Sequence, residues 1–538
     1  MSASQDVRGK RGRSPVAGFA AWIAGATGLR AGLLSMALGA LAALGFAPFH
    51  IWPLAVISFT LLVWLLDGAS LSDRARGAAF WRGWCMGFGY FLAGLWWVGS
   101  AFLVEAETYG ALIPFAVTLL PAGLAVFWGL AAALAVMFWR RDWRRVVLLA
   151  AMLFVFEMLR GHILTGFPWN LVGQMWPAGG AMSQAAAYIG VYGLTALTLF
   201  AFMAPAALAA PFRRGFPSVI TPFAATVLLA LIYAGGEARL AQADVVAEPG
   251  VRLRIVQAQI DQREKWRPEN RDVVRDHYLR LTASEGLESR THVIWAESAL
   301  PVRLLEEPRT LDAVARTVGE GRVLLTGFIR RDVADPLQPR YFNSFAAISV
   351  EQGIPNPAAI YDKVKLVPFG EYTPFADLLS SIAPDALLSF ANGYSAGPGR
   401  ATVRAPGAPP LAPQICYEVV FPGFTPRGAE RPGWIVNVTN DAWYEGTPGP
   451  YQLYAQARLR AIEEGVPLAR AASGGFSGLV DPYGRVVADL PHDADDVIDA
   501  DLPAALPPTI YSLVGDAPGY LLAVAGLFVG FSRRRDRV

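Results

Sequence analysis

The chain has 538 residues, of which 54% are apolar and only 17% are charged. This balance is more apolar than that of an ordinary soluble protein and predicts membrane-spanning segments. The formal net charge of +2 gives no excess of positive charge for binding a phosphate backbone, so we expect no nucleic-acid partner.

Apolar residues are concentrated in the first 235 positions and again close to residue 520. A helix needs about 20 mostly apolar residues to cross the hydrocarbon core of a bilayer. Eight segments meet or approach this length and are predicted to be transmembrane helices. They are residues 31–48, 51–66, 78–102, 110–138, 146–160, 180–210, 217–235 and 517–532. Residues 1–30 and 533–538 are predicted to be terminal tails.

Basic residues follow every even-numbered predicted span and also precede the first one. The clusters contain Arg8, Lys10, Arg11 and Arg13; Arg74, Arg76 and Arg82; Arg140, Arg141, Arg144 and Arg145; Arg213 and Arg214; and Arg533, Arg534, Arg535 and Arg537. The positive-inside rule therefore predicts that both termini are cytoplasmic. The segment after the seventh span is then expected outside the cytoplasmic membrane.

Residues 250–503 have the composition of a globular domain and alternate strand-like with helix-like runs. Strands are predicted at 252–260, 292–296, 323–329, 342–349, 411–416 and 433–439, and helices near 269–285, 308–318 and 450–465. The turn Asp481-Pro-Tyr-Gly484 is expected to join two further β-like runs, 476–480 and 485–490. This alternation predicts a layered α/β domain and not a β-sandwich.

Three predicted strands end in polar residues. Glu297 follows the strand at 292–296, Cys416 ends the strand at 411–416, and Asn440-Asp-Ala-Trp443 follows the strand at 433–439. The carboxyl ends of strands in α/β sheets present ligand-binding groups at one rim. A free cysteine is mostly protonated at neutral pH, so a thiol nucleophile needs a base such as Glu297. Lys363 is a candidate for stabilising developing negative charge.

Each of these residues, taken singly, also has an ordinary structural explanation. A lone cysteine is usually a buried apolar filler. For Glu297 alone, a solvated acid in a loop is the favoured interpretation. Lys363 and Lys365 share one strand face, so periodicity does not choose between them. We expect no disulfide, because Cys85 lies in the third predicted span and Cys416 in the outer domain.

Four motifs together resemble the signature runs of the nitrilase superfamily: Trp295-Ala-Glu-Ser298, Tyr361-Asp-Lys-Val-Lys-Leu-Val-Pro-Phe-Gly-Glu371, Ile415-Cys-Tyr-Glu418 and Asn440-Asp-Ala-Trp443. The run ending in Glu371, the membrane-half motif Gly166-Phe-Pro-Trp169 and the pattern of seven spans before and one after the domain resemble the apolipoprotein N-acyltransferase branch. The resemblance implies an α-helical membrane bundle joined to an αββα sandwich. It also implies a bacterial inner-membrane location with the domain on the periplasmic side.

The resemblance further implies roles for individual residues. Glu297, Lys363 and Cys416 match the catalytic triad of the family, which selects Lys363 over Lys365. The family match also makes Glu371 and Glu418 supporting residues that shape and polarise the site. Tyr417 and Trp443 match positions that line the acyl pocket or its entrance.

The reaction implied by the resemblance moves a fatty acyl group from a phospholipid donor, typically the sn-1 chain of phosphatidylethanolamine, to a lipoprotein acceptor. The acyl group passes through a thioester on Cys416 to the α-amine of the N-terminal diacylglyceryl-cysteine, with ping-pong kinetics. We expect no metal or cofactor, because the five histidines are scattered and none has His-x-x-x-His spacing.

Other interpretations stay open at this point. A membrane-tethered nitrilase or amidase would share the triad and use water to hydrolyse a carbon–nitrogen bond, and a scaffold for lipoprotein traffic would lack catalysis. Residues 375–390 are predicted to be either a mobile lid that touches lipid or a packed surface helix. Glu157 and Arg160 are predicted to be either a structural pair or a contact for a lipid head group.

Overall fold

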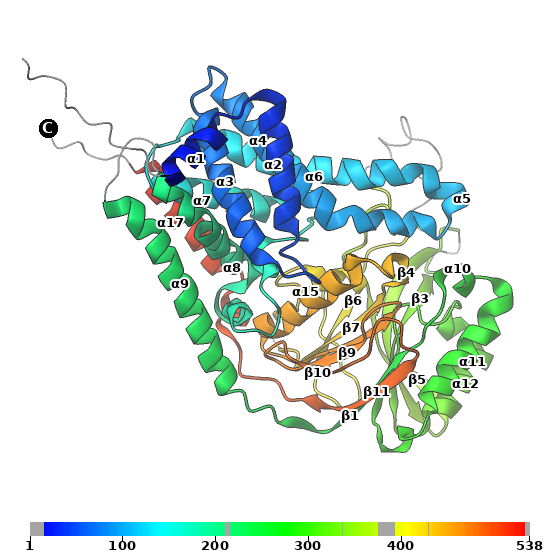
Figure 1. Ribbon diagram of the computed structural model, residues 1–538. Helices are drawn as coiled ribbons and strands as arrows, with labels where there is room; N and C mark the ends of the chain where they lie inside the picture. Colours follow the sequence, from blue (N-terminus) through cyan, green and yellow to red (C-terminus); the bar gives the residue numbers. More distant parts are fainter. Residues whose placement is uncertain (1–14, 210–215, 336, 375–392, 429, 533–538) are drawn as a thin grey trace, which may run out of the picture.

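The structure is a computed structural model that describes residues 15–209, 216–335, 337–374, 393–428 and 430–532. A bundle of helices from the first half of the chain lies against an α/β domain from the second half (Figure 1). The last helix returns to the bundle, where α17 (Ala517–Phe531) packs on α7 (Arg144–His162) and α8 (Ala186–Met203).

Helices dominate the first 241 residues. The α-helices are α1 (Pro15–Ala24), α2 (Gly28–Ala43), α3 (Trp52–Ala69), α4 (Ala75–Leu95), α5 (Ala106–Tyr109), α6 (Ile113–Met137), α7, α8 and α9 (Phe216–Ala241). Short 3-10 helices, among them Trp96–Leu103 and Val172–Met175, continue or connect them. Helices thus occur at all eight segments predicted to span a membrane.

Five of the described helical segments are both long and apolar enough to cross a membrane. They are Trp52–Ala69, Ala75–Leu103, Ala106–Met137, Met182–Ala209 and Ser218–Ala241. The pair α1 and α2 makes a sixth if the two helices, bent by 115°, count as one span. The predicted fifth and eighth spans fall short, because α7 carries several charged residues and α17 has only 15 residues. The count of eight spans therefore stays a prediction.

Small residues allow the helices of the bundle to approach closely. A Cβ atom on Gly39 of α2 would lie 2.0 Å from the carbonyl oxygen of Met86 in α4. A Cβ atom on Gly89 of α4 would likewise lie 2.0 Å from the carbonyl oxygen of Met36 in α2. Contacts of this kind replace the hydrophobic effect as the force between helices surrounded by lipid.

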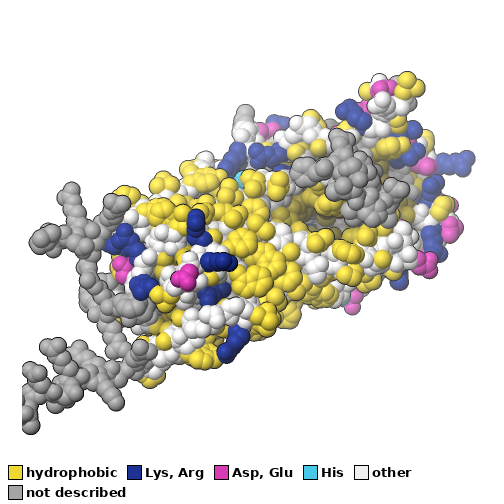
Figure 2. Space-filling model, turned by 90° about the horizontal axis from the view of Figure 1, so that it is seen from above, with side chains coloured by type: hydrophobic (Ala, Val, Ile, Leu, Met, Phe, Trp, Pro, Cys, Tyr) yellow, Lys and Arg dark blue, Asp and Glu magenta, His cyan; other side chains and the backbone are white. Residues whose placement is uncertain are grey.

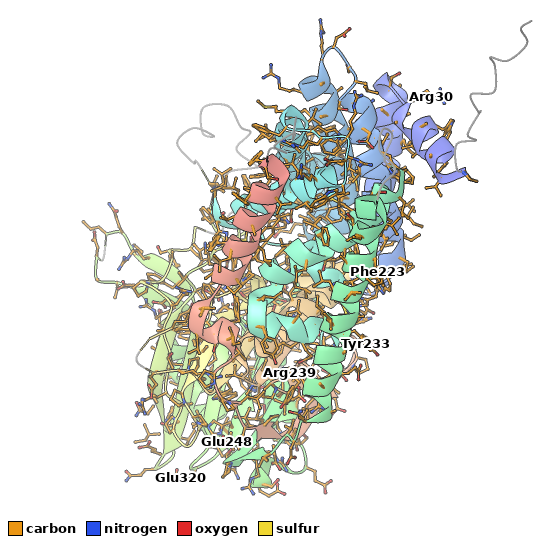
Figure 3. The ribbon with its side chains drawn as sticks, turned by 90° about the vertical axis from the view of Figure 1, so that its left-hand side faces the viewer. Arg30, Phe223, Tyr233, Arg239, Glu248 and Glu320 are labelled. Atoms are coloured by element: carbon orange, nitrogen blue, oxygen red, sulfur yellow. The ribbon has the colours of Figure 1, made fainter. Side chains whose placement is uncertain are left out.

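The outside of the bundle is apolar. Viewed from the helical side, its face is mainly hydrophobic (Figure 2). The long helix α9 projects Phe223 and Tyr233 outward (Figure 3), and their side chains are 67% and 53% exposed. Aromatic and aliphatic side chains with this exposure are expected in a surface that contacts lipid.

Glu157 and Arg160 of α7 form an ion pair inside the bundle, and both side chains are completely buried. Trp128 donates to Glu157 at 2.7 Å, and Arg160 donates to the carbonyl oxygen of Trp169 at 2.8 Å. The structure therefore favours the structural pair over the lipid contact. The pair attaches the loop that contains Gly166 and Trp169 to α7.

The second half of the chain folds into two sheets. The first has strand order β11-β1-β2-β3-β4-β5 and the second has order β10-β9-β8-β7-β6. The strands are β1 (Ala247–Gln257), β2 (His292–Ile294), β3 (Val323–Asp332), β4 (Arg340–Glu351), β5 (Ile354–Asp362), β6 (Leu411–Ile415), β7 (Trp434–Asn440), β8 (Leu468–Ser473), β9 (Gly478–Val480), β10 (Val486–Asp489) and β11 (Asp496–Pro503).

Apolar side chains of both sheets form a common core between them. The helices α11 (Arg271–Thr282) and α12 (Pro308–Val318) cover the outer face of the first sheet, and α15 (Pro448–Glu464) lies between the second sheet and the membrane helices (Figure 1). The short helices α10 (Gln262–Lys265) and α16 (Ile510–Val514) complete the set of described α-helices in this half. The predicted layered α/β domain is thus an αββα sandwich with one helical layer buried against the bundle.

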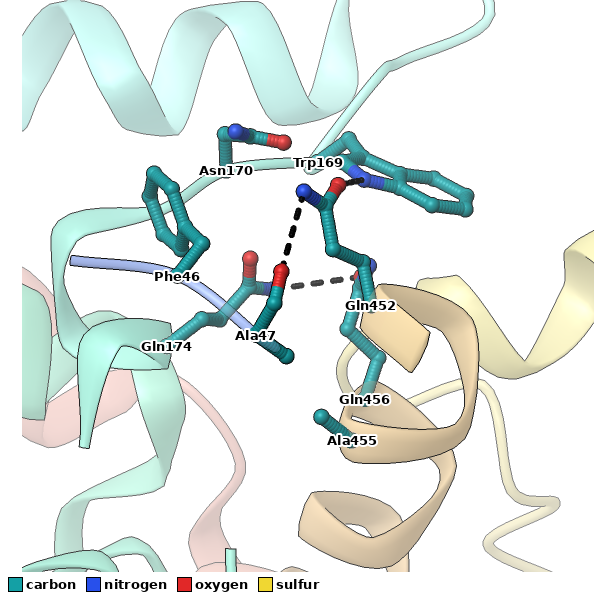
Figure 4. A pocket seen from close by; sticks show the side chains of 8 residues that line it. All are labelled: Phe46, Ala47, Trp169, Asn170, Gln174, Gln452, Ala455 and Gln456. Carbon is teal, nitrogen blue, oxygen red and sulfur yellow. Dashed lines mark hydrogen bonds between the residues drawn. The ribbon is translucent and has the colours of Figure 1, made fainter. Parts of the chain in front are cut away.

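The inner side of α15 carries polar residues that contact the membrane half. Trp169 donates to Gln452 Oε1 at 2.8 Å, Gln452 donates to the Ala47 carbonyl oxygen at 3.4 Å, and Gln174 donates to Gln456 Oε1 at 3.3 Å (Figure 4). These hydrogen bonds satisfy amide groups that are removed from water at the junction between the two halves.

A break in α8 provides a further link between the halves. Gly190 has a φ of 66° and lies so close to Tyr511 that a Cβ atom would meet its ring at 2.3 Å. The break frees the backbone N–H of Val191, which donates to Glu463 Oε1 at 2.8 Å, and Glu463 also pairs with Arg460 at 3.1 Å. The carboxylate of Glu463 thus serves as a cap for the interrupted membrane helix.

We predict that Glu463→Ala destabilises the protein by about 3–5 kcal/mol, because it leaves Arg460 and the Val191 N–H buried without their partner. Thermal unfolding of the full-length protein in detergent would show a lower midpoint. Glu430→Ala is the control, because Glu430 pairs with the exposed Arg404 and its loss should cost about 1 kcal/mol or less. Equal midpoints for the two variants would contradict this role for Glu463.

Candidate active site

The three predicted triad residues lie at the ends of three strands. Glu297 follows β2, Lys363 comes directly after β5, and Cys416 comes directly after β6. Lys363 is only 1% exposed, and its ammonium group donates to Glu297 Oε1 at 3.3 Å and to Glu371 Oε1 at 2.9 Å. Lys365 instead donates to the Thr165 carbonyl oxygen of the membrane half at 3.0 Å. The structure thus places Lys363, and not Lys365, between the two carboxylates.

Asn343 of β4 is a further member of this cluster, which the sequence analysis missed. Its side-chain amide donates to Glu297 Oε1 at 2.6 Å and to Glu371 Oε1 at 2.8 Å. Residues 342–350 of β4 are all buried, and a buried amide requires partners, but this run also contains Ser344 and Ser349, so the sequence alone did not distinguish Asn343.

Backbone N–H groups hold the second oxygen of each carboxylate. Asn440 donates to Glu297 Oε2 at 2.9 Å, and Val367 donates to Glu371 Oε2 at 2.7 Å. Gly327 of β3 leaves room for this arrangement, since a Cβ atom there would lie 2.6 Å from the Glu297 Cα atom. Both carboxylates are therefore fixed in position before any substrate binds.

Cys416 occupies a strained elbow between β6 and the 3-10 helix Cys416–Val420. Its φ of 48° is in the left-handed region, which non-glycine residues seldom adopt and which is often found at functional sites. Burial raises the pKa of the Cys416 thiol above its ordinary value, and the charge of Glu297 adds to this effect while that of Lys363 opposes it. The resting thiol is therefore protonated and needs a base.

Lys363 keeps its charge despite burial. Burial alone would lower the pKa of Lys363, but the carboxylates of Glu371 and Glu297 outweigh this effect and raise the pKa well above its ordinary value. The site thus contains a permanent cation next to the elbow that carries the thiol.

Glu418 stabilises the elbow and the loop after β5 through hydrogen bonds. It is completely buried and accepts hydrogen bonds from the Tyr361 hydroxyl at 2.9 Å and from the backbone N–H groups of Val364, Lys365 and Ile415 at 2.7, 3.1 and 2.8 Å. Burial raises its pKa to about 7. Because these four donors flank Lys363 and Cys416, Glu418 holds two of the candidate catalytic residues in register.

Tyr417, the residue after the nucleophile, contacts the membrane half. Its hydroxyl donates to the Gly166 carbonyl oxygen at 3.1 Å, and its ring stacks near Phe167 with 6.4 Å between centroids. Trp443 is half-buried in the 3-10 helix Ala442–Tyr444. The site is therefore attached directly to the loop that Arg160 holds.

Aromatic rings from both halves lie near the elbow. Trp97 packs against Trp169 at 5.0 Å and edge-on against Tyr444 at 4.9 Å, and Tyr444 interacts electrostatically with Cys416. Tyr444 was not among the predicted site residues. These rings make one wall of the site apolar and suited to an acyl chain.

Two further expectations concern metals and the lid. Among the described residues there is no group of three or more histidine, cysteine or acidic side chains that could hold a metal ion. The proposed lid at 375–390 lies outside the residues that the structure describes.

Two family models match the chain. The model of the apolipoprotein N-acyltransferase N-terminal domain matches residues 38–204, and the carbon-nitrogen hydrolase model matches residues 286–509. Curated apolipoprotein N-acyltransferases from Rhodopseudomonas palustris and Bradyrhizobium diazoefficiens are 40% and 41% identical, over 95% and 94% of this chain and 96% of each relative.

The chain belongs to the apolipoprotein N-acyltransferase family. Another family member, from Allorhizobium ampelinum, is 42% identical over 88% of this chain and 90% of its own. Among solved structures, an amidase of the nitrilase superfamily from Nesterenkonia AN1 is 19% identical and covers 48% of this chain and 93% of its own, with a TM-score of 0.33. Membership of the family makes the chain an acyltransferase and favours this activity over the membrane-tethered amidase that also fitted the motifs.

We predict that Asn343→Ala slows acylation of the enzyme on the order of 100-fold, because small displacements of catalytic groups have effects of this size. The side chains of Glu297 and Glu371 would lose the amide that connects them. Single-turnover measurement of acyl-enzyme formation tests this, with Ser349→Ala farther along β4 as the control. An unchanged rate in Asn343→Ala would show that the bridge has no catalytic value.

We predict that iodoacetamide alkylates Cys416 slowly at pH 7 and faster as the pH rises above 9, because the raised pKa leaves little thiolate at neutral pH. Mass spectrometry of the peptide that contains Cys416, after short exposures between pH 6 and 10, measures this rate. Fast alkylation that does not change between pH 6 and 8 would instead indicate a stable resting thiolate.

Proposed function

We propose that the enzyme transfers an acyl chain from the sn-1 position of a phospholipid such as phosphatidylethanolamine to the α-amine of a lipoprotein's N-terminal diacylglyceryl-cysteine. The observation that carries this proposal is the cluster of Glu297, Lys363 and Cys416 beside an aromatic wall supplied partly by the membrane half. A thiol, a base and a cation are the groups that acyl transfer through a thioester requires.

In the first step, Glu297 accepts the Cys416 proton as the sulfur attacks the ester carbonyl carbon of the phospholipid. Lys363 stabilises the negative charge that develops on the carbonyl oxygen. The ester C–O bond then breaks, and Glu297 returns the proton to the departing oxygen. Lysophospholipid leaves, and the acyl chain stays on Cys416 as a thioester.

In the second step, the lipoprotein amine attacks the thioester carbonyl carbon. Glu297 accepts a proton from the amine, the C–S bond breaks, and the sulfur leaves as a thiolate that takes the proton back from Glu297. Asn343 and the backbone N–H of Asn440 keep Glu297 in one position for both proton transfers. Because one product leaves before the second substrate reacts, the kinetics are ping-pong.

The supporting residues have distinct roles in this proposal. Glu371 shares Lys363 with Glu297 and so fixes the ammonium group. Glu418 holds the elbow, while Tyr417 and Trp443 line the path of the acyl chain between the site and the bilayer. The proposed path is consistent with the contact between Tyr417 and the Gly166 loop.

We also infer that the domain faces the periplasm and that both termini are cytoplasmic. Arg30 lies at the end of the bundle that is far from Glu248 and Glu320 of the domain (Figure 3). An arginine at the end opposite the domain supports this orientation under the positive-inside rule. Residues 1–30, whose helix α1 packs on α3, and residues 533–538 would then lie on the cytoplasmic side. Residues 31–235 and 517–532 would form the membrane part, and residues 250–503 the periplasmic catalytic domain.

We predict that purified enzyme incubated with phosphatidylethanolamine carrying different sn-1 and sn-2 chains gains the mass of the sn-1 chain on Cys416. Hydroxylamine should remove the added mass, since it cleaves thioesters. Cys416→Ala and Glu297→Gln should gain none, because one lacks the nucleophile and the other the base. Cys85→Ala is the matched control and should be acylated like the wild type. Absence of an adduct on the wild-type protein would refute the thioester mechanism.

A further inference from the structure

The chain contains very few lysines: four, against 42 arginines. Three of the four, Lys265, Lys363 and Lys365, lie in the α/β domain. Buried cations elsewhere in this domain, such as Arg254 and Arg470, are arginines with carboxylate partners at 2.6 Å. A buried lysine is therefore unusual in this protein, and Lys363 shows that one such position serves the active site.

Lys265, the last residue of α10, is the second buried lysine. Its side chain is completely buried, and its ammonium nitrogen has no hydrogen-bond partner among the described residues. The ring of Trp266 lies 5.9 Å away and gives only a weak cation–π contact. Burying a charged group without a partner is costly, so its retention requires an interaction at longer range.

That interaction is with Glu297, which is the only charged group among the described residues with which Lys265 has a resolved electrostatic interaction. Hydrogen bonds connect α10 with Glu297 as well: the side chain of Gln262, on the same side of α10, accepts a hydrogen bond from the Asn440 side chain at 2.9 Å. Asn440 in turn holds Glu297 Oε2, whereas Lys363 bonds to Oε1. Lys265 thus acts on Glu297 from α10, and Lys363 from the loop after β5.

The charges of the cluster support a role for a second cation. Glu297 and Glu371 carry two negative charges and Lys363 one positive charge, so one negative charge is left inside the protein. Cys416, Tyr394, Tyr417 and Tyr444 also interact with this cluster and are neutral when protonated. Glu418 interacts with Lys363 as well and, when ionised, adds to the negative charge. Lys265 supplies a second positive charge that offsets this excess.

We propose that Lys265 is a positioning residue that acts through Glu297: as a second cation, it keeps the Glu297 carboxylate ionised in the resting enzyme. Only an ionised Glu297 accepts the Cys416 proton, so the loss of Lys265 makes acylation fail at low pH first. The inference rests on the function proposed above.

The properties of Lys265 fit this role near neutral pH. Burial lowers its pKa to about 8, while the charge of Glu297 opposes the shift. The group is therefore still mostly protonated at pH 7. A guanidinium would keep its charge at any physiological pH but is larger and planar.

The experiment measures acyl-enzyme formation from phosphatidylethanolamine in a single turnover, by mass spectrometry of full-length protein in detergent, from pH 5 to 9. Lys265→Met removes the charge and keeps the length of the side chain. We expect the acid limb of its profile to move to higher pH by about one unit, because loss of an opposite charge that interacts with a buried carboxylate favours the protonated acid. The rate should then be about tenfold below wild type at pH 5 and close to it at pH 8.

Two further variants serve as controls. Lys365→Met removes the other non-triad lysine of the domain and should leave the acid limb in place, because Lys365 bonds to Thr165 and not to Glu297. Lys265→Arg keeps the charge, so its acid limb should stay at the wild-type pH even if its shape lowers the overall rate. This variant also tests the inference if Lys265→Met does not fold.

Two results would overturn the inference. One is a Lys265→Met profile that is lowered equally at every pH with its acid limb in place, which would indicate a packing role only. The other is an acid limb that shifts in Lys265→Arg despite the retained charge. Failure of the wild-type enzyme to form an adduct at any pH would instead reject the proposed function, so the two failures are distinguishable.

Discussion

Two buried carboxylates that share one ammonium group are the constraint on which the catalytic half of this protein depends. Glu297 and Glu371 are 6% and 8% exposed, so water does not compensate their charges. Every one of their oxygens must therefore meet a protein donor, and the donors come from β4, from the loop after β5 and from the end of β7. The fold brings segments far apart in the chain to one point, and the charges make that arrangement costly to alter.

The same requirement explains the architecture around the thiol. In the proposed mechanism the protonated Cys416 gains its reactivity from its neighbours, and so the elbow must stay in register with Glu297 and Lys363. Glu418 provides this by accepting donors from both sides of the elbow, and its complete burial makes these bonds hard to exchange for water. Backbone N–H donors thus hold most of the groups around Cys416 in place, and the sheets set the positions of these donors.

The sequence predicted much of this fold, and the failures have physical causes. Eight β-strands and three helices of the domain were predicted near their observed positions, because their apolar runs are bounded by turns. β5 was missed because it is an exposed edge strand with two prolines, and β11 because its acidic side chains resemble a loop. β8 was missed because its run Leu-Ala-Arg-Ala-Ala-Ser is rich in alanine, which has a low strand propensity. The number of spans was harder to predict, since α7 combines apolar length with buried charges that only the packed bundle can satisfy.

For the site, the motifs indicated the residues that the proposed chemistry needs but not the residues that hold them in position. Asn343 has no distinctive sequence context, and its role follows only from the pairing of β4 with its neighbours. Lys265 is likewise an ordinary lysine in a polar run, and only its burial distinguishes it. Both depend on contacts between residues distant in sequence, which periodicity and spacing do not encode.

The contact between Tyr417 and the Gly166 carbonyl oxygen joins the residue beside the nucleophile to a loop of the membrane bundle. That loop is held in turn by Arg160, inside the bundle. Hydrogen bonds and the short backbone segments between them therefore connect the interior of the helices to the residue after Cys416. A change in the lateral pressure or thickness of the surrounding bilayer that moves these helices would thus also act on the elbow that carries the thiol.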